Sequence, residues 1–153
     1  MDLNEEESVI QWIQDIDVPA ALISYTYRTI QKSFAKELEP YHIGWGHFAI
    51  LMSLFEMEGS SQDGLALSRG FDKTMIAKSV VRLEEEGFIR RVTDENDRRV
   101  KRLYLTEKSR NLHPKMKEIG YKLNEYLFTE FNADESALVM RSLRKIALNA
   151  SKL

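Results

Sequence analysis

The segment from Arg90 to Thr106, RRVTDENDRRVKRLYLT, holds a dense group of side chains whose types suggest chemistry. Five arginines and one lysine lie between Arg90 and Arg102, around the acidic turn sequence DEND. Guanidinium and ammonium groups bind phosphate oxygens through charge-assisted hydrogen bonds, so the segment is a candidate contact for a polyanion. A solvated turn rich in Asp and Asn is the competing interpretation of this segment taken alone.

Basic residues are unevenly distributed along a chain that is slightly acidic overall. The 153 residues carry 22 Lys and Arg against 24 Asp and Glu, a formal net charge of −2. Between Leu65 and Arg110 we count 12 basic and 8 acidic residues, whereas the first 27 residues contain no Lys or Arg. A basic middle suits a protein that presents one face to a nucleic acid, although a chance fluctuation explains the imbalance equally well.

The composition excludes several classes of chemistry. The absence of cysteine removes disulfides, thiolate catalysis, thiol redox sensing and cysteine-based zinc sites. There is no Gly-rich phosphate loop, and the three histidines lie in different predicted elements, so we expect neither an enzyme, a metal site nor a cofactor. The acidic start lacks the regions of a signal peptide, and no apolar run approaches the roughly 20 residues of a membrane span. We therefore expect a cytoplasmic protein without a membrane partner.

Periodicity and helix start and stop signals predict the elements that must position these side chains. Helices are predicted after Pro19 up to Pro40, in GWGHFAILMSLFEMEG, in QDGLALSRG, from Asp72 to Gly87, from about Thr106 to Phe131 and from about Ala133 to Ser151. FIRRV and VKRLYL are predicted to form two β-strands around a polar loop.

Two local features of these helices lead to specific expectations. Leu65, Ala66 and Leu67 are expected to face inward from the short helix in QDGLALSRG. Pro114 is expected to kink the long helix near Leu112–His113, because proline removes a helical hydrogen bond and clashes with the preceding turn.

Two consecutive helices and the hairpin together have the order of a winged helix-turn-helix. In such modules the second helix lies in the DNA major groove, with its N-terminal residues toward the base edges. If Ile76, Val80 and Leu83 are buried, the opposite face of that helix is basic, small and hydrogen-bonding near its N-terminus. An ordinary solvated amphipathic helix is the alternative, and it would not place charge with this polarity. The outward residues are Lys73, Thr74, Ala77, Lys78 and Val81.

The run LALSRGFDKTMIAKSVVRLEEEGFIRRVTDENDRRVKRLYLTEKSR resembles the core of the multiple-antibiotic-resistance regulator (MarR) family. The motifs VVRLEEEGFIRR, DENDRR and LYLTEKS carry the resemblance in this order, and the flanking helices fall where the family keeps its dimerisation helices. The resemblance implies a homodimeric transcription regulator, a repressor, that binds a pseudo-palindromic operator in double-stranded DNA. It also implies a recognition helix over residues 72–87 in the major groove and a wing over residues 93–100 in the minor groove.

The resemblance assigns roles to individual side chains of the wing and the recognition helix. Asp97 matches the acid that orients the wing, Arg99 the minor-groove arginine, and Arg82 the arginine that holds a backbone phosphate. Arg98 lies beside Arg99 at a variable position of the family pattern. The predicted DNA-binding residues are therefore Lys73, Thr74, Lys78, Arg82, Arg98 and Arg99.

The expected fold class is mainly α, an α+β winged helix with its N- and C-terminal helices forming a dimerisation stem. We expect one MarR-type domain over residues 1–153, with dimerisation helices in 1–39 and 107–153 and a winged-helix lobe over 44–106. Apolar positions from Val9 to Ile16 and from Leu138 to Leu153 exceed what one small lobe could cover, so a partner subunit is expected to bury them. Packing of these helices within one chain is the alternative.

A small aromatic or carboxylate effector is a further partner that the resemblance implies. Its predicted contacts are Tyr25 and Arg28, in the helix after Pro19, and His42, Trp45 and His47, around the start of the helix in GWGHFAILMSLFEMEG. Solvent-facing or internally satisfied histidines are the alternative interpretation of His42 and His47.

A winged helix can also serve only in protein–protein assembly, and this is the competing function. Such a module should present an apolar patch on the face of its second helix. This sequence instead has Lys73, Thr74 and Lys78 there, with Arg99 on the adjoining hairpin.

Overall fold

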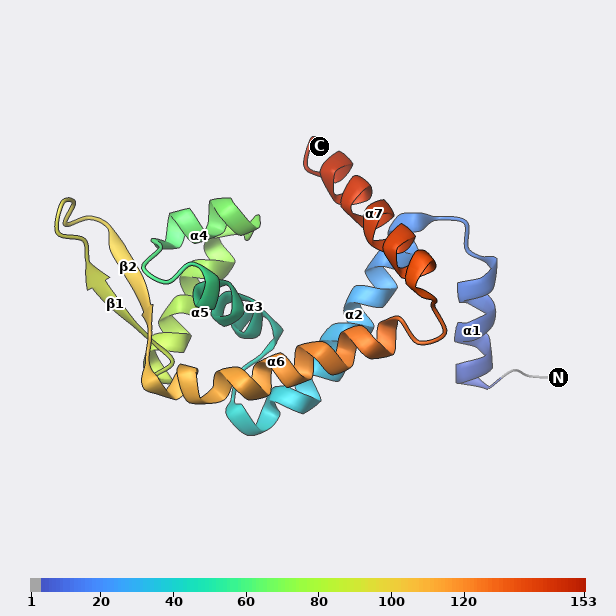
Figure 1. Ribbon diagram of the computed structural model, residues 1–153, viewed down its shortest axis with the longest axis horizontal. Coiled ribbons are helices and arrows are strands. Elements are labelled where there is room, and N and C mark those ends of the chain that lie inside the picture. The colour runs from blue at the N-terminus through green and yellow to red at the C-terminus, as the bar shows by residue number, and fades with distance from the viewer. Residues whose placement is uncertain (1–3) are drawn as a thin grey trace. The chain divides into compact units, whose positions relative to one another are not determined.

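The computed structural model describes residues 4–153 as helices with one two-stranded antiparallel sheet (Figure 1). The chain forms two compact units, of which the first ends at Arg110 and the second is Asn111–Leu153. This architecture confirms the expected mainly α fold class with a winged helix, whereas the domain boundaries drawn from the sequence stay predictions. The elements in chain order are α1 (Glu5–Asp15), α2 (Pro19–Leu38), η1 (Glu39–Tyr41), α3 (Trp45–Glu56), α4 (Gln62–Arg69), α5 (Lys73–Glu85), β1 (Ile89–Thr93), β2 (Lys101–Leu105), α6 (Glu107–Leu127) and α7 (Ala133–Ala150).

The helix ends follow from local sequence signals. Asp72 caps α5 by accepting a hydrogen bond from the Met75 N–H at 2.7 Å, as the sequence predicts. Gly87 follows α5 at a φ of 74°, in the left-handed region that glycine enters without strain. Helix α1 is an addition to the predicted order, and it starts at a capping box between Asn4 and Glu7.

The core of the first unit is formed by the facing sides of α3, α4, α5 and the hairpin, together with Phe34 and Leu38 from the end of α2. Ile76, Val80 and Leu83 of α5 are almost fully buried, as predicted. The expectation for Leu67 is wrong, because its side chain is 87% exposed while Leu65 and Ala66 are buried. A helix turns by about 100° per residue, so α4 cannot bury three consecutive side chains on one narrow face.

Strands β1 and β2 form a hairpin that projects beyond α4 and α5 (Figure 1). Ile89 pairs with Leu105 at its base and Thr93 with Lys101 at its end. The segment before α4 extends this sheet at the outer side of β2, where the Gly59 N–H donates to the Leu103 carbonyl at 2.9 Å. The middle of β2 is therefore paired with the α3–α4 connection on one side and with β1 on the other.

Helix α6 runs through Pro114 without interruption. Proline at this position removes the hydrogen bond that would reach the Arg110 carbonyl, and the bend expected near Leu112–His113 stays a prediction. The helix ends at Leu127, four residues earlier than expected, and Glu130 has a left-handed φ of 67° in the turn that precedes α7.

Candidate nucleic-acid interface

The outward face of α5 carries the predicted DNA contacts of the recognition helix. Lys73, Thr74 and Lys78 are exposed, and within residues 4–153 the side chains of Thr74 and Lys78 have no ion pair or hydrogen bond. Lys73 Nζ lies 3.5 Å from Asp63 Oδ1, a weak exposed pair that a phosphate could replace. Arg82 is also exposed and forms an ion pair with Glu86 at 2.6 Å. The helix thus presents a basic, hydrogen-bonding surface in its first two turns.

The acidic end of α5 has a structural role. Glu84 accepts hydrogen bonds from the Arg91 backbone N–H at 3.0 Å and from Arg91 Nε at 2.7 Å. The Arg91 guanidinium is the main cause that lowers the pKa of Glu84 below its ordinary value. This pair fixes the end of the recognition helix to β1, so Arg91 is committed to the fold and is less available to phosphate than its sequence position suggests.

The wing (residues 93–100) brings Asp97 and Arg99 together. Arg99 Nε and Nη2 each donate to a carboxylate oxygen of Asp97 at 3.1 Å, and the Arg99 backbone N–H donates to Oδ1 at 3.0 Å. The bond from the Arg99 guanidinium lowers the pKa of Asp97, and the same bond raises the pKa of Arg99. Because the Arg99 side chain is still 91% exposed, the carboxylate holds its direction without covering it.

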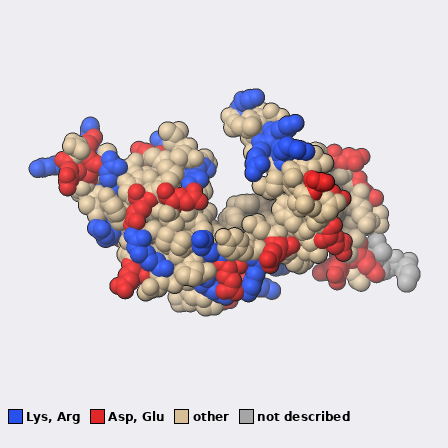
Figure 2. Space-filling view, in the orientation of Figure 1, with Lys and Arg blue, Asp and Glu red and all other residues tan. Residues whose placement is uncertain are grey.

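Arg98 is exposed beside Arg99, and in the described part of the chain it has no hydrogen bond or ion pair. Figure 2 shows basic and acidic side chains interleaved on this end of the hairpin. Although acidic side chains lie nearby, none of those in the described residues forms an ion pair with Arg98. Its role on DNA, like that of Arg99, stays a prediction.

A second carboxylate organises the wing from within. Asp94 is only 9% exposed, and its Oδ1 accepts the backbone N–H groups of Asn96 at 2.9 Å and Asp97 at 3.0 Å. Its Oδ2 accepts a hydrogen bond from Arg102 Nε, and Arg102 Nη1 reaches the Gly59 carbonyl at 3.0 Å. The bond from Arg102 is the first of several hydrogen bonds that lower the pKa of Asp94.

Asp94 is the first residue of the turn sequence DEND, but its link to Arg102 is not expected from the sequence. The strand register is the signal that could have revealed this link. Val92 pairs with Arg102, so Asp94, two residues after Val92, lies on the same face of the hairpin as a diagonal neighbour of Arg102.

The first turn of α6 also holds the end of the recognition helix, and we call this contact the carbonyl clamp. Three side chains donate to the three consecutive backbone carbonyls that follow α5. Ser109, the centre of the clamp, is completely buried. The bonds join Lys108 Nζ to the Glu86 carbonyl (2.6 Å), Thr106 Oγ1 to that of Gly87 (2.7 Å) and Ser109 Oγ to that of Phe88 (2.5 Å).

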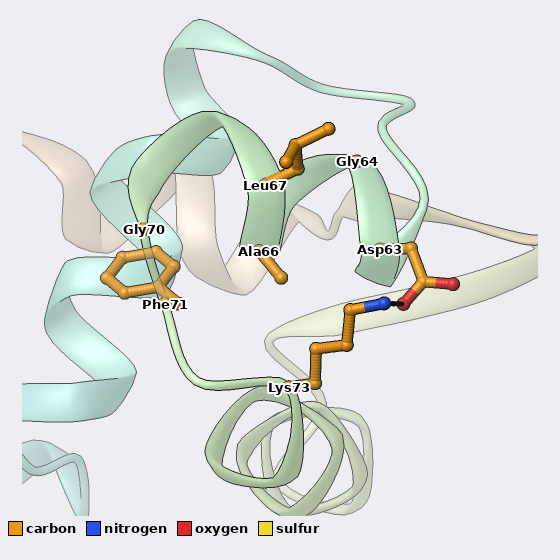
Figure 3. A pocket seen from close by; sticks show the side chains of 7 residues that line it. All are labelled: Asp63, Gly64, Ala66, Leu67, Gly70, Phe71 and Lys73. Carbon is orange, nitrogen blue, oxygen red and sulfur yellow. Dashed lines mark ion pairs between the residues drawn. The ribbon is translucent and has the colours of Figure 1, made fainter. Parts of the chain in front are cut away.

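A shallow, open pocket of about 470 Å³ lies between α4 and the start of α5 (Figure 3). Leu67 and Phe71 contribute apolar surface, and the Lys73–Asp63 ion pair crosses its edge. None of the five predicted effector residues lines it. The full lining is Asp63, Gly64, Ala66, Leu67, Gly70, Phe71 and Lys73.

The predicted effector residues lie on α2, η1 and α3, where their described contacts are with other residues. The Tyr25 ring lies 5.6 Å from that of Trp12, and Arg28 donates to Ser24 at 2.6 Å. Trp45 packs against Phe34, Phe48 and Tyr27. These five side chains are not brought together around a pocket in the part of the chain that the structure describes, so their role stays a prediction.

The two remaining members of that set are histidines in different surroundings. His42 ends η1 at a left-handed φ of 56°. His47 Nδ1 accepts the Gly44 N–H at 3.4 Å. Burial, followed by the positive charge of Arg82, lowers the pKa of His47 below its ordinary value of 6.5. The charge that contributes to this shift belongs to Arg82, one of the predicted DNA contacts on α5.

Residues 4–153 show neither a metal-ligand cluster nor a membrane-spanning helix. No group of three or more His, Asp or Glu side chains there is placed to hold a metal ion. None of the helices in that range combines the length and the apolar character of a bilayer span.

Known proteins resemble this chain in sequence and in fold. The sequence profile of the MarR family matches residues 43–101, which include α3, α4, α5, β1 and the wing. The HTH-type transcriptional regulator YybA of Bacillus subtilis (strain 168) is 27% identical over 107 residues, which make up 70% of this chain and 71% of YybA.

Solved structures extend the likeness over most of the chain. A MarR transcriptional regulator from Methanosarcina mazei Go1 is 38% identical, with a TM-score of 0.80, over 87% of this chain and 96% of that protein. A MarR family regulator from Listeria monocytogenes, solved in complex with a 26mer DNA, shares the fold at a TM-score of 0.83 with 22% identity, over 90% and 91% of the two chains. The protein described here belongs to the MarR family of DNA-binding, winged helix-turn-helix transcription regulators.

Proposed function

We propose that this regulator is a homodimer that represses transcription by binding a pseudo-palindromic operator. In this proposal α5, within residues 72–87, enters the major groove and the wing, residues 93–100, enters the minor groove. The observation that carries the proposal is the Asp97–Arg99 pair, which aims an almost fully exposed guanidinium from the hairpin. As a regulator of genomic DNA, the protein is expected to act in the cytoplasm and to have no catalytic role.

The recognition helix supports the same proposal. Lys78 and Thr74 are exposed and have no side-chain partner in the described residues. Side chains that contact phosphate or base edges are expected to be available in this way. An isolated α5 reads few base pairs, so specific binding favours two copies related by two-fold symmetry.

Exposed apolar side chains in both units support the homodimer. In α1, Val9, Ile10 and Ile13 are each more than a third exposed. In α7, Met140, Leu143 and Ile146 are also exposed, and their spacing of three residues places them on one side of the helix. Apolar stripes of this kind are commonly buried against a partner. We propose that a second copy of the chain buries them, so that the helices in residues 1–39 and 107–153 form the dimer interface.

Release of the operator by a small aromatic or carboxylate effector is the remaining part of the proposal. Trp45 and Arg28 offer the chemistry, an aromatic face and a cation, that such a ligand needs. A direct test is a titration of the protein–operator complex with benzoate-type ligands, repeated with Trp45→Ala. Ligand-independent DNA binding in both proteins would contradict this part alone.

The competing function is assembly with another protein through the winged helix. The outer face of α5 argues against it, because Lys73, Thr74 and Lys78 present charge and hydroxyl groups where an assembly module needs apolar surface. Leu67 is exposed on the neighbouring α4, but a single exposed leucine is common on protein surfaces.

The test of the proposed function is selection of bound fragments from genomic DNA, followed by footprinting. We expect a short two-fold-symmetric site with two protected major-groove segments and flanking minor-groove protection. Recovery of fragments without a shared site, or protection of a single half-site by a monomer, would contradict the proposal.

A further inference from the structure

Asp94 and Arg102 form a connected network between the backbone of the wing and the α3–α4 connection. We propose that these two residues are positioning residues, which hold the wing in the orientation that lets Arg98 and Arg99 reach DNA. The inference rests on the proposed function. It adds two side chains that act in DNA binding without touching the DNA themselves.

Asp94 acts on the loop that carries the arginines. Its Oδ1 accepts the N–H groups of Asn96 and Asp97, so it closes the turn immediately before Arg98 and Arg99. The backbone also closes this loop, because the Asp94 N–H donates to the Val100 carbonyl at 2.9 Å. The direction of the Asp97–Arg99 pair therefore depends on a turn that the Asp94 carboxylate shapes from a nearly buried position.

Arg102 joins that turn to a fixed point outside the hairpin. It uses Nε for Asp94 and Nη1 for the Gly59 carbonyl, so one planar guanidinium bridges the two. Gly59 has a φ of 85° and donates its own N–H to the Leu103 carbonyl, which fixes the position of the carbonyl that Arg102 uses. A hairpin held at only one end would let its tip swing, whereas this bridge restrains the tip relative to the α3–α4 connection.

The competing role for Arg102 is a general positive charge that attracts phosphate. The two roles predict changes of opposite sign in DNA affinity when Asp94 is replaced. Replacing Asp94 with Asn removes one negative charge near the DNA, which on charge alone strengthens binding. It preserves the side-chain oxygen that can accept the N–H groups of the turn, but the amide replaces the carboxylate partner of Arg102. The positioning role predicts weaker binding instead.

Glu95 supplies the matched control. It is the next residue in the wing, it is exposed, and its side chain has no hydrogen bond or ion pair within residues 4–153. Glu95→Gln makes the same change in charge as Asp94→Asn without touching the network. A difference in DNA affinity between the two variants therefore reports on the orientation of the wing and not on its charge.

The experiment compares affinity for the selected operator duplex at one salt concentration and at a temperature where circular dichroism shows every variant folded. Asp94→Asn and Arg102→Lys are expected to bind about 5- to 20-fold more weakly than the wild type, whereas Glu95→Gln binds equally or more tightly. In an Arg98→Ala/Arg99→Ala background, Asp94→Asn should have little further effect, because the wing has no arginine left to position.

Three results would overturn the inference. Asp94→Asn binding as tightly as Glu95→Gln would mean that the carboxylate is not needed, and full affinity of Arg102→Lys would mean that any cation suffices. An undiminished effect of Asp94→Asn in the arginine-free background would assign it a general structural role. If wild-type protein binds no duplex, the proposed function itself fails, and this outcome differs from tight wild-type binding with unaffected variants.

Discussion

Arg99 lies against the carboxylate of Asp97, the residue two positions before it, with Nε and Nη2 both 3.1 Å from its oxygens. The pair uses part of the donor capacity of the guanidinium and leaves the side chain almost fully in solvent. A flexible arginine loses much rotamer freedom when it binds DNA, and a pre-formed pair reduces that loss. The local turn sequence therefore determines the direction in which the wing extends the Arg99 side chain.

Arg99→Ala is expected to weaken operator binding about tenfold or more, because a minor-groove arginine contact contributes on the order of 1–3 kcal/mol. The melting temperature should stay within a degree or two, since Arg99 is exposed and pairs only within its own turn. Fluorescence anisotropy and calorimetry measure the two quantities. Lys32→Ala, which removes an exposed charge from α2, is the control for general electrostatics. Equal decreases of affinity in both variants would mean that Arg99 has no special position.

Lys78→Ala should lower affinity for operator and unrelated duplexes by similar factors, because a lysine–phosphate contact does not read sequence. The slope of log affinity against log salt should fall by about one unit for each phosphate that the variant no longer neutralises. Binding isotherms at several salt concentrations measure this slope. A decrease confined to the operator, with an unchanged slope, would instead assign Lys78 to a base.

Ser109→Ala tests the carbonyl clamp between α6 and the end of α5. The variant loses the hydrogen bond from Ser109 Oγ to the Phe88 carbonyl. That carbonyl still accepts a hydrogen bond from the Thr106 N–H at 3.0 Å. We therefore expect a decrease of about 1 kcal/mol in the free energy of unfolding, measured by urea denaturation. Ser33→Ala on the exposed surface of α2 should change the same quantity by less than about 0.5 kcal/mol. Indistinguishable values for the two variants would show that the clamp contributes no stability.

The Glu58–Arg110 pair predicts a pH dependence of stability. Arg110 Nη2 donates to both oxygens of Glu58, and this bond is the main cause that lowers the pKa of Glu58 below its ordinary value of 4.5. A depressed pKa in the folded state gives stability that is complete above the unfolded value and is lost as pH falls through the folded value.

The difference in unfolding free energy between wild type and Glu58→Gln should therefore be constant above about pH 5.5 and shrink as the pH falls below 4.5. Urea denaturation between pH 3 and pH 7 measures it. Using the difference cancels the contributions of His47 and His113, whose lowered pKa values act on both proteins alike. A difference that grows on acidification has the wrong sign for this pair.

Leu143→Glu tests the proposed dimer. A carboxylate in the apolar stripe of α7 should be incompatible with burial against a partner, so sedimentation at micromolar concentration should shift from dimer to monomer. Arg144→Gln makes the same change in charge at the next residue, on a different side of the helix, and should leave the dimer intact. If both variants remained dimeric, the apolar stripe of α7 would lie outside the subunit interface.

Much of the DNA-binding lobe is predictable from sequence because its local signals agree with its tertiary contacts. Asp72 and Gly87 delimit α5, and the spacing of Ile76, Val80 and Leu83 identifies its buried face. The pairing of Asp97 with Arg99 is also predictable, since residues two apart in a tight turn lie close together.

Other features depend on contacts between segments that no local pattern reveals. Leu67 is apolar and sits beside two buried residues, yet the rotation of α4 turns it outward. Arg102 appears in the sequence as one more cation, and only the register of the hairpin and the position of Gly59 show that it is committed to Asp94. Similar charges in one short segment thus divide into two groups, with Arg91 and Arg102 holding the fold and Arg98 and Arg99 left exposed.

The most direct test of DNA binding by α5 and the wing is a salt titration of wild-type protein on the selected operator and on an unrelated duplex of equal length. We predict that log affinity falls linearly with log salt, by about 0.9 per phosphate contacted, and that the operator binds at least about 1,000-fold more tightly at physiological salt. Affinity that stays flat from low to moderate salt, or equal affinity for the two duplexes, would contradict sequence-specific DNA binding by this protein.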